Sequence, residues 1–107
     1  MHPSRAQLTQ GTDAMYMRVA RFVDPANSDE GRKLTLEISA AIKRLPGFQS
    51  YALGEDHASG QSLSVSLWDT EEHARGSGID LGRDFGPRVQ ALGFQVAPSE
   101  FFEVTAT

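Results

Sequence analysis

The sequence predicts a single α+β domain with its elements in the order β-α-β-β-α-β, and three observations support this order. Residues 61–68, QSLSVSLW, alternate serine with leucine or valine, which is the pattern of a strand with one buried face. One apolar stripe at helical spacing lies between positions 34 and 45. A glycine-containing loop at 56–60 joins two strand-like segments into a hairpin. We therefore expect a ferredoxin-like domain with a four-stranded antiparallel sheet.

The first strand and the first helix are expected in the first half of the chain. The strand covers 15–22, where methionine and valine share one face and Arg18 lies on the other. Asn27 is the expected N-cap of the helix, with Glu30 at the spacing of a capping box. Pro46 and Gly47 are expected to end this helix. The apolar stripe consists of Leu34, Ile38, Ala41, Ile42 and Leu45.

The second half begins with antiparallel strands at 48–55 and 61–68. Asp69 and Thr70 offer an N-cap for a second helix, and Glu72 lies at capping-box spacing from Asp69. Glycines at 76, 78 and 82 predict that this helix ends near Arg75. A separate helical piece then follows a loop, with Pro87 in its first turn. The last strand is expected at 100–105.

The composition limits the function. A chain of 107 residues predicts one domain, which we place at 15–107 after a flexible tail at 1–14. The net charge is −4 and no basic stripe is present, so we expect no nucleic-acid partner. No cysteine is available for disulfides, and no apolar run reaches the ~20 residues of a membrane helix, so we expect no membrane partner. The N-terminus lacks a signal peptide, so we expect a cytoplasmic protein.

Three residues are candidates for catalysis. Trp68 ends the central strand directly before a helix, where it would stack on a flat aromatic substrate or anchor the strand in the core. Arg88 could pair with a phenolate or carboxylate, or remain a solvated surface arginine. His73 is a candidate general base near neutral pH, or an exposed histidine in a first helical turn.

Ser64, Ser66 and Arg18 are candidates for ligand binding. The two serines make one face of the central strand small, which either lets helices dock closely or leaves a cavity beneath them. Arg18 is either the partner of a buried anion or an edge residue. The three histidines are scattered without acidic partners at ligand spacing, so we expect no metal site. Because no dinucleotide-binding or phosphate-loop motif is present, we also expect no cofactor.

Several short motifs resemble the antibiotic biosynthesis monooxygenase family, whose members belong to the dimeric α+β barrel superfamily. These motifs are YMRVARF at 16–22, LPGF at 45–48, the hairpin D-x-x-S-G at 56–60, LWDTEE at 67–72 and FFEV at 101–104. The resemblance implies a homodimer whose two sheets pack face to face, with the helices outside. It also implies a ligand site between sheet and helices, and a face of Leu63, Val65 and Leu67 that lines the dimer barrel.

The resemblance implies a cofactor-independent monooxygenase acting on a small aromatic or quinol-like compound. Family members of this type surround a polycyclic phenol with tryptophan, tyrosine, asparagine and arginine. Trp68 and Arg88 fit this pattern, whereas Ser64 holds the expected asparagine position and no tyrosine follows Trp68. The alternative is a non-catalytic binding or interaction domain of the same dimeric fold. Haem degradation is disfavoured, because the first strand lacks the asparagine of haem-degrading relatives and His73 comes too early in its helix.

Overall fold

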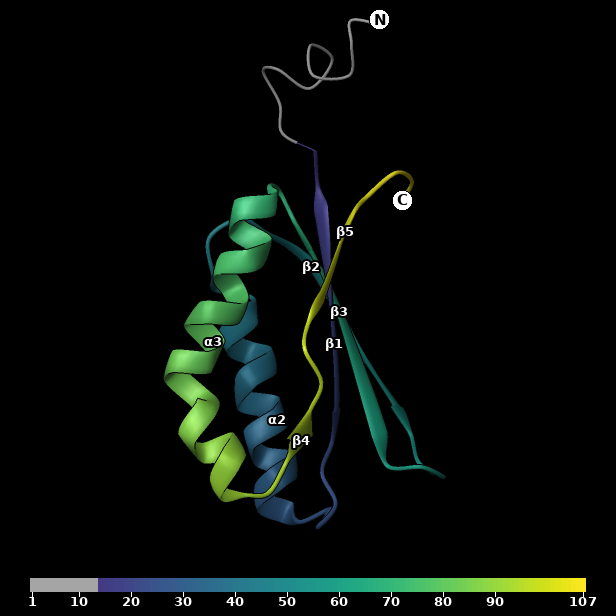
Figure 1. The fold of residues 1–107 in the computed structure, drawn as a ribbon, viewed down its shortest axis with the longest axis vertical. Helices are drawn as coiled ribbons and strands as arrows, with labels where there is room; N and C mark the ends of the chain where they lie inside the picture. Colours follow the sequence, from purple (N-terminus) through teal and green to yellow (C-terminus); the bar gives the residue numbers. More distant parts are fainter. Residues whose placement is uncertain (1–13) are drawn as a thin grey trace, which may run out of the picture.

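The computed structural model describes residues 14–107, so the tail predicted at 1–14 lies outside the described residues except for Ala14. The elements follow the predicted β-α-β-β-α-β order, with the last strand divided in two (Figure 1). They are β1 (Tyr16–Val23), α2 (Asp29–Ile42), β2 (Phe48–Asp56), β3 (Gln61–Trp68), α3 (Glu71–Ala91), β4 (Gln95–Val96) and β5 (Glu100–Glu103). Neither helix is long and apolar enough to cross a membrane.

The strands form one antiparallel sheet in the order β2-β3-β1, and both β4 and β5 pair with β1. The last strand, predicted at 100–105, is β5, which starts at Glu100 as predicted and ends two residues early at Glu103. Pro98 lies in the segment that separates β4 from β5. Proline has no N–H to donate to a ladder, so it interrupts pairing. The ferredoxin-like α+β fold predicted from the sequence is confirmed.

Both helices cover the same face of the sheet (Figure 1). The alternation of β3 turns its serines and Trp68 toward the helices, where Ser62, Ser64 and Ser66 are all buried. The intervening Leu63, Val65 and Leu67 lie on the opposite face and are only half-buried. Within the described part of the chain, no helix covers this second face.

Each helix starts at a capping residue one position later than the first predicted cap. Ser28, not Asn27, caps α2: its Oγ accepts a hydrogen bond from the Gly31 N–H at 3.0 Å. Asn27 instead adopts a positive φ of 45°, which asparagine tolerates better than most residues. Thr70 caps α3 in the same way through the N–H of His73, also at 3.0 Å.

The prediction that glycines break the second helix is wrong, because α3 is one helix of 21 residues. Pro87, expected in a first turn, lies inside it. Helix propensity is a weak preference, and glycine costs only about 1 kcal/mol relative to alanine, so tertiary packing can override it. Here Ala74, Ser77 and Leu81 are buried on the first half of α3 and supply that packing.

The core lies at the end of the sheet where β3 leads into α3. Ile42, Trp68, Ala74 and Leu81 form its buried cluster, and Trp68 has no exposed surface. The Trp68 ring meets Phe48 edge-on, with the ring centroids 5.8 Å apart, an arrangement that aromatic pairs favour. This cluster fills only one end of the space between helices and sheet, and the remaining space contains a cavity.

Candidate functional site

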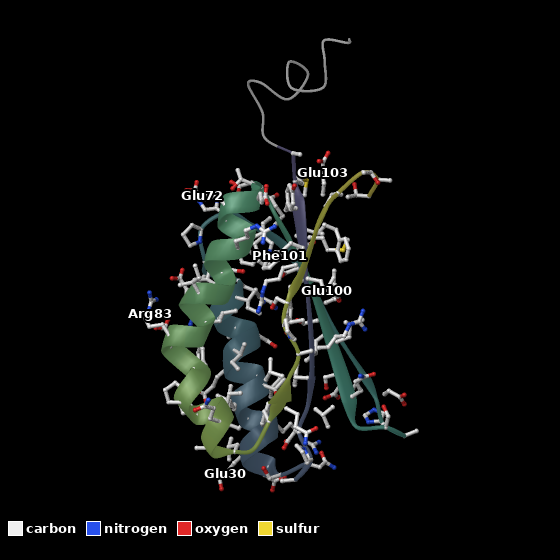
Figure 2. The ribbon with its side chains drawn as sticks, viewed as in Figure 1. Glu30, Glu72, Arg83, Glu100, Phe101 and Glu103 are labelled. Atoms are coloured by element: carbon white, nitrogen blue, oxygen red, sulfur yellow. The ribbon has the colours of Figure 1, made fainter. Side chains whose placement is uncertain are left out.

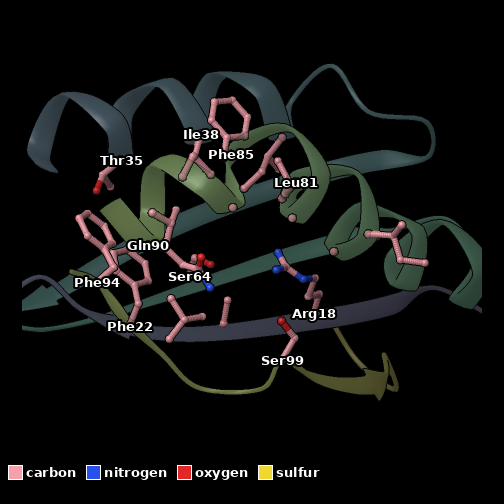
Figure 3. A pocket seen from close by; sticks show the side chains of 18 of the residues that line it. Arg18, Phe22, Thr35, Ile38, Ser64, Leu81, Phe85, Gln90, Phe94 and Ser99 are labelled. Atoms are coloured by element: carbon pink, nitrogen blue, oxygen red, sulfur yellow. The ribbon is translucent and has the colours of Figure 1, made fainter. Parts of the chain in front are cut away.

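A cavity of about 910 Å³ lies between the helix-facing side of the sheet and the two helices (Figure 3). This volume is within the range of small-molecule sites. Residues from β1, β2, β3, both helices and the β4–β5 segment line it. Two of its lining residues, Ile79 and Val96, are strongly exposed apolar side chains, at 70% and 59%. Ile79 belongs to α3 and Val96 to β4, so the cavity wall includes exposed apolar side chains from both elements.

The cavity is open because the residues that face each other across it are small. Ala20 and Ser64 supply little volume from the sheet. On α3, Gly78, Gly82 and Gly86 lie four residues apart and therefore on one face of the helix, which lines the cavity. A Cβ at Gly82 or Gly86 would meet no atom within 4 Å. Of the two outcomes predicted for the small serine face, the structure has the cavity.

One end of the cavity is aromatic. The rings of Phe22 and Phe94 stack with their centroids 5.8 Å apart and their planes 12° from parallel. Phe85 of α3 lies farther along the cavity, beside Leu81 of the same helix and Ile38 of α2 (Figure 3). This end can hold a flat apolar ring by burying its faces against the side chains.

Arg18 provides the positive charge in the cavity wall. It lies in the middle of β1 and is half-buried, and burial lowers the pKa of its guanidinium. The Nε atom is buried and has no hydrogen-bond partner. A Cβ at Gly78 of α3 would lie 3.5 Å from this Nε, so the glycine leaves room for the guanidinium. Figure 3 shows Arg18 and the Phe22–Phe94 pair at opposite ends, with Ser64 and Gln90 between them.

Tyr51 brings a hydroxyl to the cavity from β2. Its oxygen lies 2.7 Å from the Ser39 Oγ, which donates to the Thr35 carbonyl oxygen at 3.0 Å. Because the Ser39 proton is used there, the Tyr51 hydroxyl donates to Ser39. The Tyr51 oxygen is left as an acceptor on the cavity side of the sheet.

Trp68, the first predicted catalytic residue, does not line the cavity. It is fully buried, and its indole Nε1–H donates to the Ser66 Oγ at 2.8 Å. Ser66 is therefore occupied by Trp68 and is absent from the cavity wall, whereas Ser64 reaches it. This is the core arrangement that the sequence left open beside substrate stacking.

Arg88 and His73 also lie away from the cavity wall. Arg88 forms a bidentate pair with Glu37 of α2, at 3.1 and 2.9 Å, which lowers the pKa of Glu37 and raises that of Arg88. The His73 Nδ1 lies 2.6 Å from the Asp69 Oδ1, one helical turn earlier. Of the six predicted site residues, the cavity wall therefore contains only Arg18 and Ser64, and the catalytic and ligand-binding roles of all six stay predictions.

Several lining residues were not found from the sequence. Tyr51 and Phe22 lie on the same face of the sheet as Ser64 and Arg18, so strand alternation could have identified them. The four-residue spacing of the glycines at 78, 82 and 86 was a signal for a helix face without side chains. The prediction instead took the glycines at 76, 78 and 82 as a break in the helix. Gln90 and Phe94 gave no comparable signal, because their position depends on α3 being continuous. No group of three potential metal-ligating side chains occurs in residues 14–107.

Comparisons with known proteins agree on the fold. No protein-family model matches the sequence, and no curated protein matches it. SnoaB from Streptomyces nogalater, described as a cofactor-independent oxygenase, is 21% identical, with a TM-score of 0.64 over 88% of this chain and 96% of SnoaB. Rv0793 from Mycobacterium tuberculosis is 20% identical, with a TM-score of 0.67 over 88% of this chain and 98% of Rv0793.

A third solved structure, a candidate antibiotic biosynthesis monooxygenase from Deinococcus radiodurans, is 15% identical, with a TM-score of 0.67 over 87% of this chain and 94% of that protein. At these identities the likeness concerns the fold. The resemblance in the sequence motifs and the likeness of the structures lead to the same fold. The chain has the ferredoxin-like α+β fold that is also found in structures described as antibiotic biosynthesis monooxygenases.

Proposed function

We propose that the protein is a cofactor-independent oxygenase that binds a small aromatic, quinol-like compound in the cavity. The observation that carries this proposal is the cavity of about 910 Å³ with an aromatic end formed by the stacked rings of Phe22 and Phe94. The fold is shared with SnoaB, a cofactor-independent oxygenase. An apolar, partly enclosed site between sheet and helices suits a flat ring that must be kept from water.

The proposed reaction oxidises an activated ring carbon with molecular oxygen. A ring methylene loses two hydrogens and gains one oxygen atom as a carbonyl, and the second oxygen atom of O₂ leaves as water. An electron-rich, quinol-like ring can supply the electrons itself. The contribution of the protein is then to orient the ring and to exclude water, which are effects of positioning and desolvation.

Oxygen uptake with anthrone, which has a ring methylene of this kind, tests the proposal. Ser64→Leu should place a bulky side chain on the cavity floor and reduce uptake at least tenfold, because Ser64 is buried and lines the cavity. Ser59→Leu is the matched control, since Ser59 is exposed in the β2–β3 loop and lies outside the cavity wall. Equal uptake by the wild type and Ser64→Leu would contradict an active site in this cavity.

A second function, binding without catalysis, is favoured by the engagement of the predicted catalytic residues elsewhere. Trp68 donates to Ser66, His73 contacts Asp69 and Arg88 pairs with Glu37. A protein that binds anthrone by calorimetry, yet consumes no oxygen above the uncatalysed rate, would be a binding domain of the same fold.

We also propose that the protein forms a homodimer through the uncovered face of the sheet. Met17, Leu63, Val65, Leu67 and Phe102 lie on this face, and Phe102 is 50% exposed. An apolar sheet face that none of the described helices covers requires a second layer, and an identical subunit is the commonest partner. The shared fold with dimeric α+β barrel structures supports the same arrangement.

A further inference from the structure

Arg18 lies on the face of the sheet that the two helices cover, so its positive charge is between the sheet and the helices. It is in the middle of β1, directly opposite Ser66 on β3 and Phe101 on β5. Because β1 is paired with a strand on each side at this position, Arg18 lies in the interior of the sheet and not at its edge. Its guanidinium extends into the cavity, as Figure 3 shows, and burial lowers its pKa.

No carboxylate compensates this charge among residues 14–107. None of the ion pairs in the described structure includes Arg18, and its buried Nε has no hydrogen-bond partner. The groups packed around it are neutral: Tyr51 on β2, Gly78 on α3 and Phe101 on β5. A partly desolvated guanidinium without a partner is unfavourable, because a charge taken out of water requires a compensating charge or hydrogen bonds.

The other arginine in the cavity wall is already paired. Arg75 contacts Glu71 at 2.9 Å between Nε and Oε2, and its guanidinium lies 4.5 Å from the centroid of the Phe101 ring. The carboxylate of Glu71 is thereby neutralised by Arg75, which is on the same helix and exposed. Arg18 is thus the unpaired cation of the cavity.

From this arrangement we propose that the ligand is a planar aromatic compound with one oxyanion, and that Arg18 is its counter-ion. The inference rests on the proposed function only in taking the cavity as the ligand site. A guanidinium offers several N–H donors in one plane, which match a carboxylate or a ring oxyanion. The lining provides one unpaired positive charge, so a second negative charge on the ligand would face neutral side chains.

The shape of the cavity orients this ligand. Its oxyanion lies at Arg18, and its ring extends past Ser64 and Gln90 toward the Phe22–Phe94 pair (Figure 3). The absence of a side chain at Gly78 keeps space beside the guanidinium, where an added Cβ would already be in contact with Nε. Arg18 is in this way a specificity-determining residue, which selects the charged form of the ligand.

Calorimetric titration with matched probes tests the charge requirement. The probes are 1-naphthoate and its neutral analogue 1-naphthamide. We expect the wild type to bind naphthoate at least about tenfold more tightly, since hydrogen bonds between charged groups are stronger than those to a neutral amide. Arg18→Met should remove this preference while keeping naphthamide binding, and Arg18→Lys should keep part of it.

Arg83→Met is the control for loss of one positive charge. Arg83 is exposed on the side of α3 that faces away from the sheet, where it pairs with Asp80 and Asp84 (Figure 2). This variant should bind both probes as the wild type does. An equal preference for naphthoate in Arg18→Met and wild type would overturn the inference. If Arg18→Met failed to fold, the neutral variant Arg18→Gln would take its place. Loss of the preference in folded Arg18→Gln would support the inference, and full retention would overturn it.

A third probe, the enolate of 2-hydroxy-1,4-naphthoquinone, distinguishes a ring oxyanion from a carboxylate. Tighter binding of this probe than of naphthoate assigns the site to ring oxyanions, and the reverse assigns it to carboxylates; weak binding of both relative to naphthamide contradicts the inference.

The same experiments distinguish failure of this inference from failure of the proposed oxygenase function. Oxygen uptake without a preference for the charged probe would contradict only the role of Arg18 as counter-ion. A preference for the charged probe without oxygen uptake would contradict only the oxygenase activity.

Discussion

Two large side chains on the helix-facing side of the sheet have opposite environments. Trp68 is fully buried, and both its ring and its indole N–H have partners within the protein. Arg18 lies on the same side, half-buried, with a buried Nε that has no partner. A residue with all its contacts satisfied stabilises the fold, whereas an unsatisfied charge at a cavity points to a ligand. Of these two candidates, Arg18 is the one in the cavity wall, and it is the residue for which we propose a ligand contact.

The structural role of Trp68 predicts a loss of stability on Trp68→Phe. The smaller ring leaves a void in the cluster with Ile42 and Ala74, and the Ser66 hydroxyl loses the indole donor. We expect a decrease of about 2 kcal/mol in the free energy of unfolding, measured by urea denaturation followed by circular dichroism. Binding of 1-naphthoate to the folded variant should be unchanged.

The control for this prediction is Ser66→Ala, which removes only the hydrogen-bond acceptor of the indole. It should also lower stability, because the buried N–H is left without a partner. A Trp68→Phe variant with wild-type stability but weakened ligand binding would contradict the core role. It would favour the substrate-stacking role that the sequence also allowed.

Strand alternation made some site residues predictable and others not. Arg18 and Ser64 could be placed on one surface because β1 and β3 alternate regularly and pair in register. Whether that surface met closely docked helices or a cavity could not be decided from the strands. The answer depends on the volume that α3 presents, which is a property of another element.

Local propensity and tertiary packing disagree along α3. Four glycines and Pro87 lie within its 21 residues, and each disfavours a helix by itself. Gly78, Gly82 and Gly86 lie on the face over the cavity, where they add no packing that would favour the helix. The buried contacts of Ala74 and Leu81 hold the first half in place, so the breaks predicted from the sequence do not occur.

Because Gly78, Gly82 and Gly86 of α3 face the cavity, we expect that substitutions on this helix can change stability and ligand binding independently. Gly82→Ala and Gly76→Ala should each raise the free energy of unfolding by about 0.5–1 kcal/mol, because alanine favours a helix and neither Cβ meets an atom within 4 Å. Gly82→Leu should then weaken naphthoate binding by filling the cavity. Gly76→Leu is its matched control, since Gly76 lies on α3 outside the cavity wall.

Thermal unfolding and calorimetry of these four variants check both effects. Weaker binding in both leucine variants would mean that the loss comes from a general change in α3. Unchanged binding in Gly82→Leu would show that the space over Gly82 is not used by the ligand.

The architecture of the whole molecule was predictable, because the element order and the strand pairing follow from hydrophobic period and loop length. The position of the cavity follows from the same arrangement: both helices cover one face of the sheet, and the cavity is on that side. The other face is left for association. Its residues Leu63, Val65 and Leu67 come from β3, in the middle of the sheet between β1 and β2.

A charge in the centre of this uncovered face should prevent dimer formation. Val65 lies between Val19 of β1 and Ala52 of β2, so a lysine there would be buried against the partner sheet without a counter-charge. We expect the wild type to have twice the mass of one chain by light scattering, and Val65→Lys to have the mass of one chain. Leu36→Lys is the control, because Leu36 is 64% exposed on α2 and away from this face, and it should remain dimeric. A wild type that is monomeric at all concentrations, or a Val65→Lys variant that stays dimeric while folded, would place the dimer contact elsewhere or exclude it.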